Sequence, residues 1–166
     1  MIGPINPKAS NGHSFILVAI DYFIKWVEVG SFAHVTQKVV KKFVERDLIC
    51  RYRPLEKIIT NNAQNFNGKL ITELYAKWKI KHSNSSPYRP KMNGVVEAVN
   101  KNVKKIIQKM VITYKDWHEM LPFALHAYRT AVWTSTGATP YMLVYGMEAV
   151  MFFRGENPII KSINRL

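Results

Sequence analysis

The sequence predicts one α/β domain in which strands come first and helices cover and follow them. Two observations point to this class: the first third of the chain holds short runs rich in Val, Ile, Phe and Trp, and apolar residues at helical spacing dominate the remainder. A hydrophobic content of 48% in 166 residues is enough to form a buried core. Strands followed by covering helices are typical of layered α/β domains.

Two antiparallel strands are expected near the amino terminus. Residues 14–21 and 24–29 are rich in β-branched and aromatic side chains, and only Tyr22 and Phe23 separate them. Before them, the apolar residues 2–5 run into a turn sequence with Asn, Pro and Gly, so they are expected to be the end of a further strand. The sheet is therefore expected to include a hairpin.

Helix and strand alternate in the next segments. Thr36 is expected to cap a helix. The apolar face of this helix comprises Val39, Val40, Phe43, Val44 and Leu48. A short strand over residues 57–60 runs into the polar residues 61–65. An amphipathic helix is expected over residues 70–78, and another strand over residues 79–82.

A loop rich in proline and serine is expected over residues 83–94, followed by a helix over residues 95–111. One face of this helix carries a glutamate followed by basic and polar residues, namely Glu97, Lys101, Lys104 and Gln108. This stripe has two interpretations. It is either a solvated face with an i,i+4 ion pair, or, because it follows the basic loop residues Arg89 and Lys91, a place where a carboxylate-bound metal meets a nucleic-acid phosphate.

Two shorter helices are expected after this one. Asp116, with Glu119 three residues later, favours a reciprocal capping arrangement at the start of the first helix. Pro122 is expected to kink the same helix. Thr139 is expected to cap the second helix, and Gly146 to end it.

The charge balance makes polyanions the leading class of partner. The chain has 24 Lys and Arg against 11 Asp and Glu, which gives a net charge of +13. Its longest apolar run, residues 15–20, is far shorter than the roughly 20 residues of a membrane-spanning helix, and no secretory signal is recognisable. Neither a membrane partner nor secretion is therefore expected. Cys50 is the only cysteine, which excludes an internal disulfide and a multi-cysteine zinc site.

Two longer motifs resemble those of integrases. Residues 58–66 (IITNNAQNF) are similar to the segment T-D-N-G-x-x-F, and residues 87–97 (PYRPKMNGVVE) are similar to P-Y-x-P-x-x-x-G-x-x-E. Thirty-five residues lie between Asn61 and Glu97, which is the interval between the second and third catalytic carboxylates in this family.

Two further segments follow the same family pattern, residues 16–26 (ILVAIDYFIKW) and residues 121–130 (LPFALHAYRT). Several long motifs in the right order are more specific than any one of them alone. Over about residues 2–150 the chain resembles the integrase catalytic core of plant gypsy-type LTR retrotransposons.

This resemblance implies an RNase H-like fold, a mixed central sheet flanked by helices, with the amino-terminal strand truncated here. It also implies DNA integration by polynucleotidyl transfer, with DNA as partner, a nuclear location and three carboxylates that hold Mg²⁺ or Mn²⁺. Glu97 occupies the third carboxylate position, whereas the second is Asn61, whose amide oxygen coordinates metals without bringing charge. In the family pattern the first carboxylate lies directly before residue 1, so it is missing from this sequence. It would be present only if the true start of the protein lies upstream.

This copy is expected to be catalytically defective, although the family it resembles is enzymatic. With Glu97 as the remaining carboxylate and Asn61 neutral, two metal ions would be poorly compensated, so metal binding is doubtful. Asp21, at the end of a predicted strand, is interpreted as a turn or capping acid rather than a metal ligand.

DNA binding is expected to survive because it is spread over many cations. The candidate surface comprises Arg89, Lys91, Lys101, Lys104 and Lys105. The alternative is that the excess lysines only solvate the domain, as is expected for Lys38, Lys41 and Lys42.

Two non-enzymatic functions remain as alternatives: a basic nucleic-acid-binding module and a dimerisation module. Aromatic anchors for a dimer would be Trp117, Phe123, Tyr128 and Trp133, although such residues are more often part of a core. A homo-oligomer is compatible with the resemblance. Residues 1–150 are expected to form the domain, and residues 151–166, which depart from the family pattern, a divergent and poorly packed tail.

Overall fold

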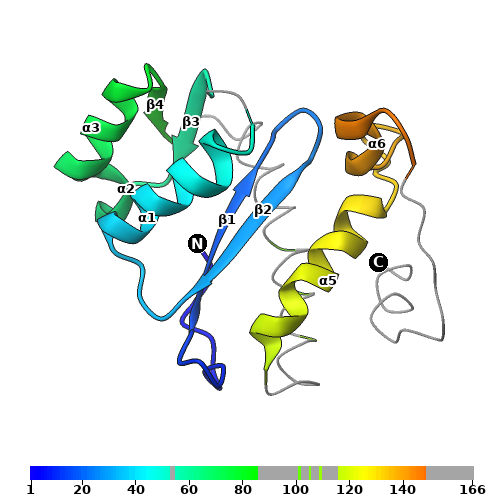
Figure 1. Ribbon diagram of the computed structural model, residues 1–166, viewed down its shortest axis with the longest axis horizontal. Helices are drawn as coiled ribbons and strands as arrows, with labels where there is room; N and C mark the ends of the chain where they lie inside the picture. Colours follow the sequence, from blue (N-terminus) through cyan, green and yellow to red (C-terminus); the bar gives the residue numbers. More distant parts are fainter. Residues whose placement is uncertain (53–54, 86–100, 102–104, 106–108, 110–115, 149–166) are drawn as a thin grey trace.

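The computed structural model describes residues 1–52, 55–85, 101, 105, 109 and 116–148 (Figure 1). In chain order its elements are β1 (Phe15–Ile20), β2 (Val27–Phe32), α1 (Gln37–Phe43), a π-helical segment (Val44–Ile49), β3 (Lys57–Thr60), α2 (Gln64–Asn67), α3 (Lys69–Lys77), β4 (Lys81–Asn84), α5 (Trp117–Thr130) and α6 (Pro140–Tyr145). The expected tail over residues 151–166 lies outside the described residues.

The predicted hairpin is present, but its second strand begins three residues later than expected. β1 and β2 are antiparallel, with Phe15 opposite Phe32 and Ile20 opposite Val27. The turn takes up residues 21–26 because the backbone N–H of Asp21 donates to the carbonyl of Trp26 at 2.8 Å. The expected strand end at residues 2–5 is represented by one antiparallel bridge, between Ile2 and Ile16.

β3 and β4 are parallel, so their carboxyl ends lie at the same edge. β3 confirms the strand expected over residues 57–60. β4 begins two residues later than the expected strand because Lys79, with a φ of 54°, adopts the left-handed conformation that no strand contains.

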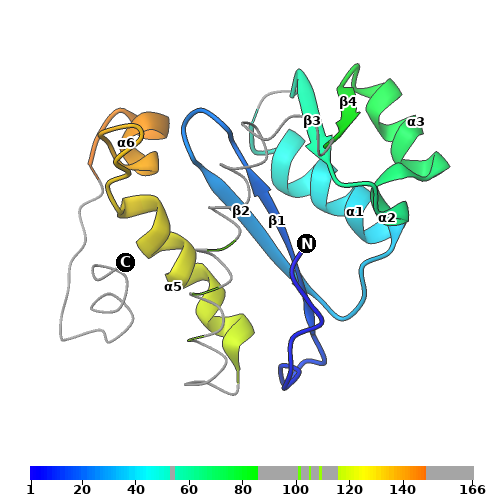
Figure 2. The ribbon, with the colours of Figure 1, turned by 180° about the vertical axis from the view of Figure 1, so that it is seen from behind.

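The hairpin lies between two groups of helices, with α5 on one side and α1 and α3 on the other (Figures 1 and 2). Successive side chains of a strand point to opposite faces. Ile16 accordingly packs in one cluster, which also contains Val27, Trp117, Leu121, Ala124 and Tyr128. Its neighbour Leu17 packs in the other, with Val40, Phe43, Val44, Ile71, Leu74 and Tyr75. Mixed α/β architecture is therefore confirmed.

The first helix keeps both its predicted cap and its predicted apolar face. The hydroxyl of Thr36 accepts a hydrogen bond from the N–H of Val39, as expected. After Phe43 the helix widens into the π-helical segment. The predicted apolar face is nevertheless retained, because Val40, Phe43 and Val44 are buried in one cluster and Val39 and Leu48 pack against it. Ile49 and Asp47 are buried, whereas Leu48 is only partly covered.

The capping arrangement predicted at Asp116 is wrong. Its carboxylate accepts a hydrogen bond from the backbone of Ser10 at 3.2 Å and makes no cap bond to α5. Pro122 lies within α5, which continues to Thr130. α6 begins at the expected Thr139 cap and ends at Gly146, whose φ of 73° suits glycine. None of the helices formed by the described residues is long and apolar enough to cross a membrane.

Candidate metal position and nucleic-acid surface

Polar side chains gather at the carboxyl ends of the parallel strands β3 and β4. Thr60 and Asn84 are paired in register at these ends. The hydroxyl of Thr60 is 2.8 Å from Nε2 of His82 and donates to Oδ1 of Asn84 at 3.3 Å. Burial lowers the pKa of His82, so the neutral imidazole is favoured here. The pattern of the sequence located the loop but not this cluster, because strand pairing assembles it.

Asn61 directly follows β3, since the strand runs into the polar residues 61–65 as expected. Its side chain is exposed, and its Oδ1 accepts a hydrogen bond from the N–H of Ala63 at 3.3 Å. Its carbonyl accepts a hydrogen bond from Nδ2 of Asn67 at 3.1 Å. These bonds hold the loop before α2, and the exposed amide of Asn61 is one of the polar groups at this edge.

The described part of this edge does not fit a pair of metal ions. Among the residues that the structure describes, no group of three or more His, Cys, Asp or Glu side chains is placed to hold a metal. Asn61 offers a neutral oxygen there, where a metal pair requires anionic ligands. Glu97 lies outside the described residues, so its distance from Asn61 stays a prediction.

Two of the five candidate DNA-binding residues are described, and both are exposed. Lys101 and Lys105 are helical and lie four residues apart, which places them on the same helix face. Lys109 is also helical and exposed. Arg89, Lys91 and Lys104 lie outside the described residues. Lys101, Lys105 and Lys109 thus place three exposed cations at four-residue spacing on this helix, and their role in DNA binding stays a prediction.

Asp21 is a turn acid, in agreement with its interpretation from the sequence. Its Oδ1 accepts hydrogen bonds from the N–H groups of Phe23 at 2.8 Å and Ile24 at 3.1 Å. Its carboxylate is thus used to fold the chain between β1 and β2.

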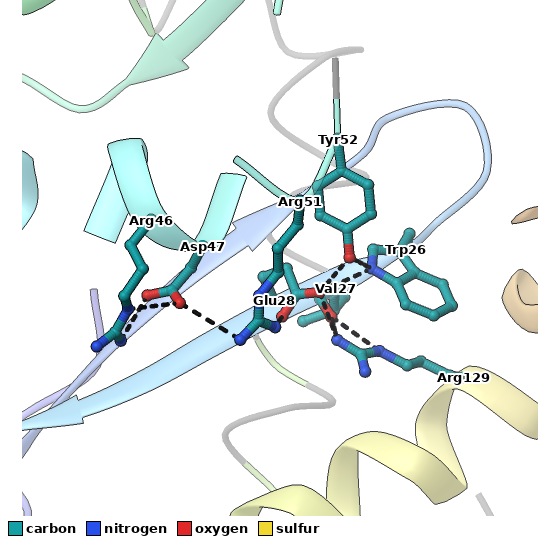
Figure 3. A network of polar contacts seen from close by, with 8 residues as sticks. All are labelled: Trp26, Val27, Glu28, Arg46, Asp47, Arg51, Tyr52 and Arg129. Carbon is teal, nitrogen blue, oxygen red and sulfur yellow. Dashed lines mark hydrogen bonds and ion pairs between the residues drawn. The ribbon is translucent and has the colours of Figure 1, made fainter. Parts of the chain in front are cut away.

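A buried charge network, which sequence reasoning missed, joins β2 to α5 (Figure 3). Glu28 is buried, and its Oε1 lies 2.8 Å from Nη2 of Arg129 and 3.0 Å from the indole Nε1 of Trp26. Tyr52 donates its hydroxyl to the same oxygen, and Arg51 lies 3.4 Å from the other. Burial, followed by the bond to Glu28, raises the pKa of Tyr52 to about 12.

Arg129 is fixed by more than its ion pair. Its Nη2 and Nε donate to the carbonyl of Val27 at 2.7 and 3.1 Å, and its guanidinium lies 4.1 Å from the ring centroid of Trp26. At the other end of the network, buried Asp47 pairs with Arg46 at 2.8 Å (Figure 3). The network is structural: it ties the hairpin to both neighbouring helical segments.

The aromatic residues considered as dimer anchors belong mainly to the core. Trp117 and Tyr128 are buried in the cluster between the hairpin and α5. Trp133 is partly buried beside them. Phe123 is exposed, so one of the four remains on the surface.

Comparisons with known proteins identify relatives among Pol polyproteins. The chain is 28% identical over 146 residues to the retrovirus-related Pol polyprotein from transposon 412 of Drosophila melanogaster, covering 87% of this chain and 12% of that protein. It is 31% identical over 141 residues to the Gag-Pol polyprotein of avian reticuloendotheliosis virus (84% and 12%). It is 30% identical over 142 residues to the Pol polyprotein of radiation murine leukemia virus (81% and 23%). No family model matches.

Solved structures give the same relationship. The catalytic core domain of BIV integrase superposes with a TM-score of 0.66 and 25% identity, covering 77% of this chain and 83% of that one. A chain of the simian T-cell lymphotropic virus intasome, in complex with PP2A regulatory subunit B56 gamma, superposes with a TM-score of 0.70 and 20% identity, covering 91% and 55%. The RNase H-like fold expected from the motifs is thereby confirmed. The plant gypsy-type subgroup is not distinguished by these relatives.

Proposed function

Because this chain is an integrase-like domain homologous to part of retroviral and transposon Pol polyproteins, we propose that it binds DNA and is a catalytically defective member of the integration machinery. The chain spans only 12% of the first two relatives, so their activity is carried over here as a proposal. The exposed pair Lys101 and Lys105, in a chain of net charge +13, supports DNA binding.

The DNA-binding surface is tested with a pair of matched variants. K101Q/K105Q removes two positive charges that lie four residues apart on an exposed helix face. K38Q/K42Q removes the same charge at the same spacing from exposed positions of α1. Fluorescence anisotropy with a short blunt DNA duplex, measured over a salt series, gives both affinity and the number of phosphate contacts.

The two variants are expected to differ in salt dependence. Because each lost phosphate contact reduces the slope of log affinity against log salt by about 1, K101Q/K105Q lowers the slope by about 2, and K38Q/K42Q leaves it unchanged. Equal slopes for both variants would place the DNA elsewhere. An affinity of the unmodified chain that does not change with salt would contradict charge-driven DNA binding.

The catalytic defect is proposed from the neutral amide at Asn61. A pair of Mg²⁺ or Mn²⁺ ions, which the integrase resemblance implies, needs carboxylate charge that this side chain does not supply. Asn61 is exposed and its bonds are local, so N61D is expected to fold normally. Calorimetric titration with Mn²⁺ should show tighter binding to N61D than to the unmodified chain. The proposed defect would be refuted if the unmodified chain cuts DNA in a metal-dependent way and the E97Q variant does not.

The proposed retrotransposon subgroup, nuclear location and oligomeric state rest on the resemblance to integrases. The motifs over residues 58–66 and 87–97 favour a plant gypsy-type LTR retrotransposon as the source, and integration implies a nuclear site of action. A homo-oligomer is also proposed, and sedimentation velocity over a concentration series tests it, since a strict monomer would exclude it.

A further inference from the structure

The turn between β1 and β2 presents two aromatic side chains to solvent. Phe23 is 80% exposed, the highest value among the exposed large hydrophobic residues in the described part of the chain. The ring of Tyr22, 38% exposed, meets it edge to face, with centroids 5.4 Å apart and planes at 89°. We call these two residues the aromatic turn. The ring of Phe23 is therefore accessible to a binding partner.

Hydrogen bonds hold the backbone of the aromatic turn in one shape. The carboxylate of Asp21 accepts from the N–H groups of Phe23 and Ile24. The backbone N–H of Lys25 donates to the carbonyl of Asp21 at 3.1 Å, and that of Asp21 donates to the carbonyl of Trp26. The ring of Phe23 is therefore presented on a fixed backbone, which lowers the entropic cost of binding to it.

Lys25 contacts the second ring of the aromatic turn, that of Tyr22. Its backbone is left-handed, with a φ of 59°, and its side chain is buried rather than extended into water. Its ammonium donates to the carbonyl of Tyr22 and lies 4.6 Å from the centroid of the Tyr22 ring. A left-handed non-glycine residue and a buried lysine are both costly, and here both serve to orient the aromatic turn.

Exposed lysines lie at the same end of the molecule as the aromatic turn. The upper end in Figures 1 and 2 contains this turn and the start of β3 and β4, whereas the carboxyl end of β3 leads down to α2. Lys57 and Lys81 are paired in register at the start of these strands, and both are exposed. Within the described residues neither forms an ion pair with an acid. This end is thus opposite the edge that holds Asn61.

The small apolar area and the positive charge at the end of the molecule with the aromatic turn favour a nucleic acid over a protein as the partner. Two exposed rings are far smaller than the roughly 800 Å² per partner of a stable protein interface. A phenyl ring matches one nucleobase, and stacking of a base on an aromatic side chain is a main source of affinity for single strands. The exposed lysines at the same end of the molecule attract a phosphate backbone.

We propose that the aromatic turn binds single-stranded DNA, with an unpaired base stacked on Phe23 and the strand attracted by Lys57 and Lys81. This inference rests on the proposed DNA-binding function and adds a second contact, separate from the helix with Lys101 and Lys105. The aromatic turn should therefore bind a single strand more tightly than a blunt duplex, because the bases of a duplex are already stacked on one another.

The test compares F23A with F123A, which removes an exposed phenylalanine from α5 instead. Anisotropy is measured with a single-stranded oligonucleotide and with a blunt duplex. F23A is expected to weaken single-strand binding by about 5- to 150-fold, and to leave duplex binding and the circular dichroism spectrum unchanged. F23W is expected to restore binding, and F123A to have no effect. K57Q/K81Q should reduce the salt slope for the single strand by about 1.4, because each phosphate contact on a single strand contributes about 0.7.

The outcomes separate this inference from the proposed function. If the unmodified chain binds neither DNA, both fail. If it binds duplex with the expected dependence on Lys101 and Lys105 but F23A binds single strands normally, only the aromatic turn is refuted. If F23A alters sedimentation and not DNA binding, the turn is a protein contact and the inference is overturned.

Discussion

Substitution of Arg129 is expected to destabilise the domain more than substitution of any exposed arginine. R129M removes the charge that faces buried Glu28 and keeps a side chain of similar length. R46M is the matched control, because Arg46 also lies 2.8 Å from a nearly buried carboxylate, that of Asp47. The two arginines differ in exposure: the side chain of Arg129 is 19% exposed, and that of Arg46 is 61% exposed.

The expected size follows from what each substitution leaves behind. Removing one partner of a buried pair costs about 3–5 kcal/mol, because the other charge remains buried. R129M also leaves the carbonyl of Val27 without two hydrogen bonds. Arg51 and Tyr52 still contact Glu28, which places the expected loss near the lower limit, about 3 kcal/mol. R46M removes a mostly exposed partner, and Arg51 still lies 3.5 Å from the carboxylate of Asp47, so at most about 1 kcal/mol is expected.

Urea unfolding at neutral pH measures both losses. A loss of about 3 kcal/mol would lower Tm by roughly 6–12 °C in a chain of this size. The double variant E28Q/R129M should lose less than the sum of the single variants, since each single change already breaks the pair. The reasoning is refuted if R129M and R46M have equal unfolding free energies, or if the double variant is strictly additive.

The remaining predictions concern pH and the core. Burial lowers the pKa of both His13 and His82 in the folded chain. Below pH 6.5 the unfolded chain therefore binds more protons than the folded chain, and the free energy of unfolding should fall as the pH drops. Urea midpoints measured at pH 7 and pH 5 test this prediction. The pKa of Tyr52 is raised to about 12, so stability should decline as pH rises above 10, and tyrosine absorbance at high pH should show late ionisation. W117A, at a fully buried position, should cost about 3–5 kcal/mol, whereas F123A should cost under 1 kcal/mol in the same urea assay.

Local signals in the sequence were sufficient to predict much of the fold. The cap at Thr36, the strand at residues 57–60 and the short helix between Thr139 and Gly146 follow from neighbouring residues alone, and the structure contains all three. Strand ends were less accurate. The turn after β1 is closed by Asp21, whose hydrogen bonds displace the start of β2 in a way that hydrophobic alternation does not record.

Features formed by residues far apart in sequence were not predictable from its pattern. The sequence around Asp116 is typical of a helix N-cap, yet its carboxylate accepts a hydrogen bond from the backbone of Ser10, more than a hundred positions away. Glu28 and Arg129 are also more than a hundred positions apart, and neither stands out in hydrophobic periodicity. At the candidate site, the motif located Asn61, whereas His82 and Asn84 join Thr60 only because β3 and β4 are parallel neighbours.

The fold and the chemistry of the candidate site are separable in this chain. Stability arises from the two clusters beside the hairpin and from the network around Glu28, and Asn61 takes part in none of these. The Oδ1 of Asn61 accepts one backbone hydrogen bond, which a carboxylate would accept equally well. Asparagine therefore gives the fold no advantage over aspartate at this position, and it removes one negative charge from the place where metals would need it. The proposal that this RNase H-like domain lacks catalysis while its basic surface binds DNA therefore makes two independent claims, so metal affinity and DNA affinity must be measured separately.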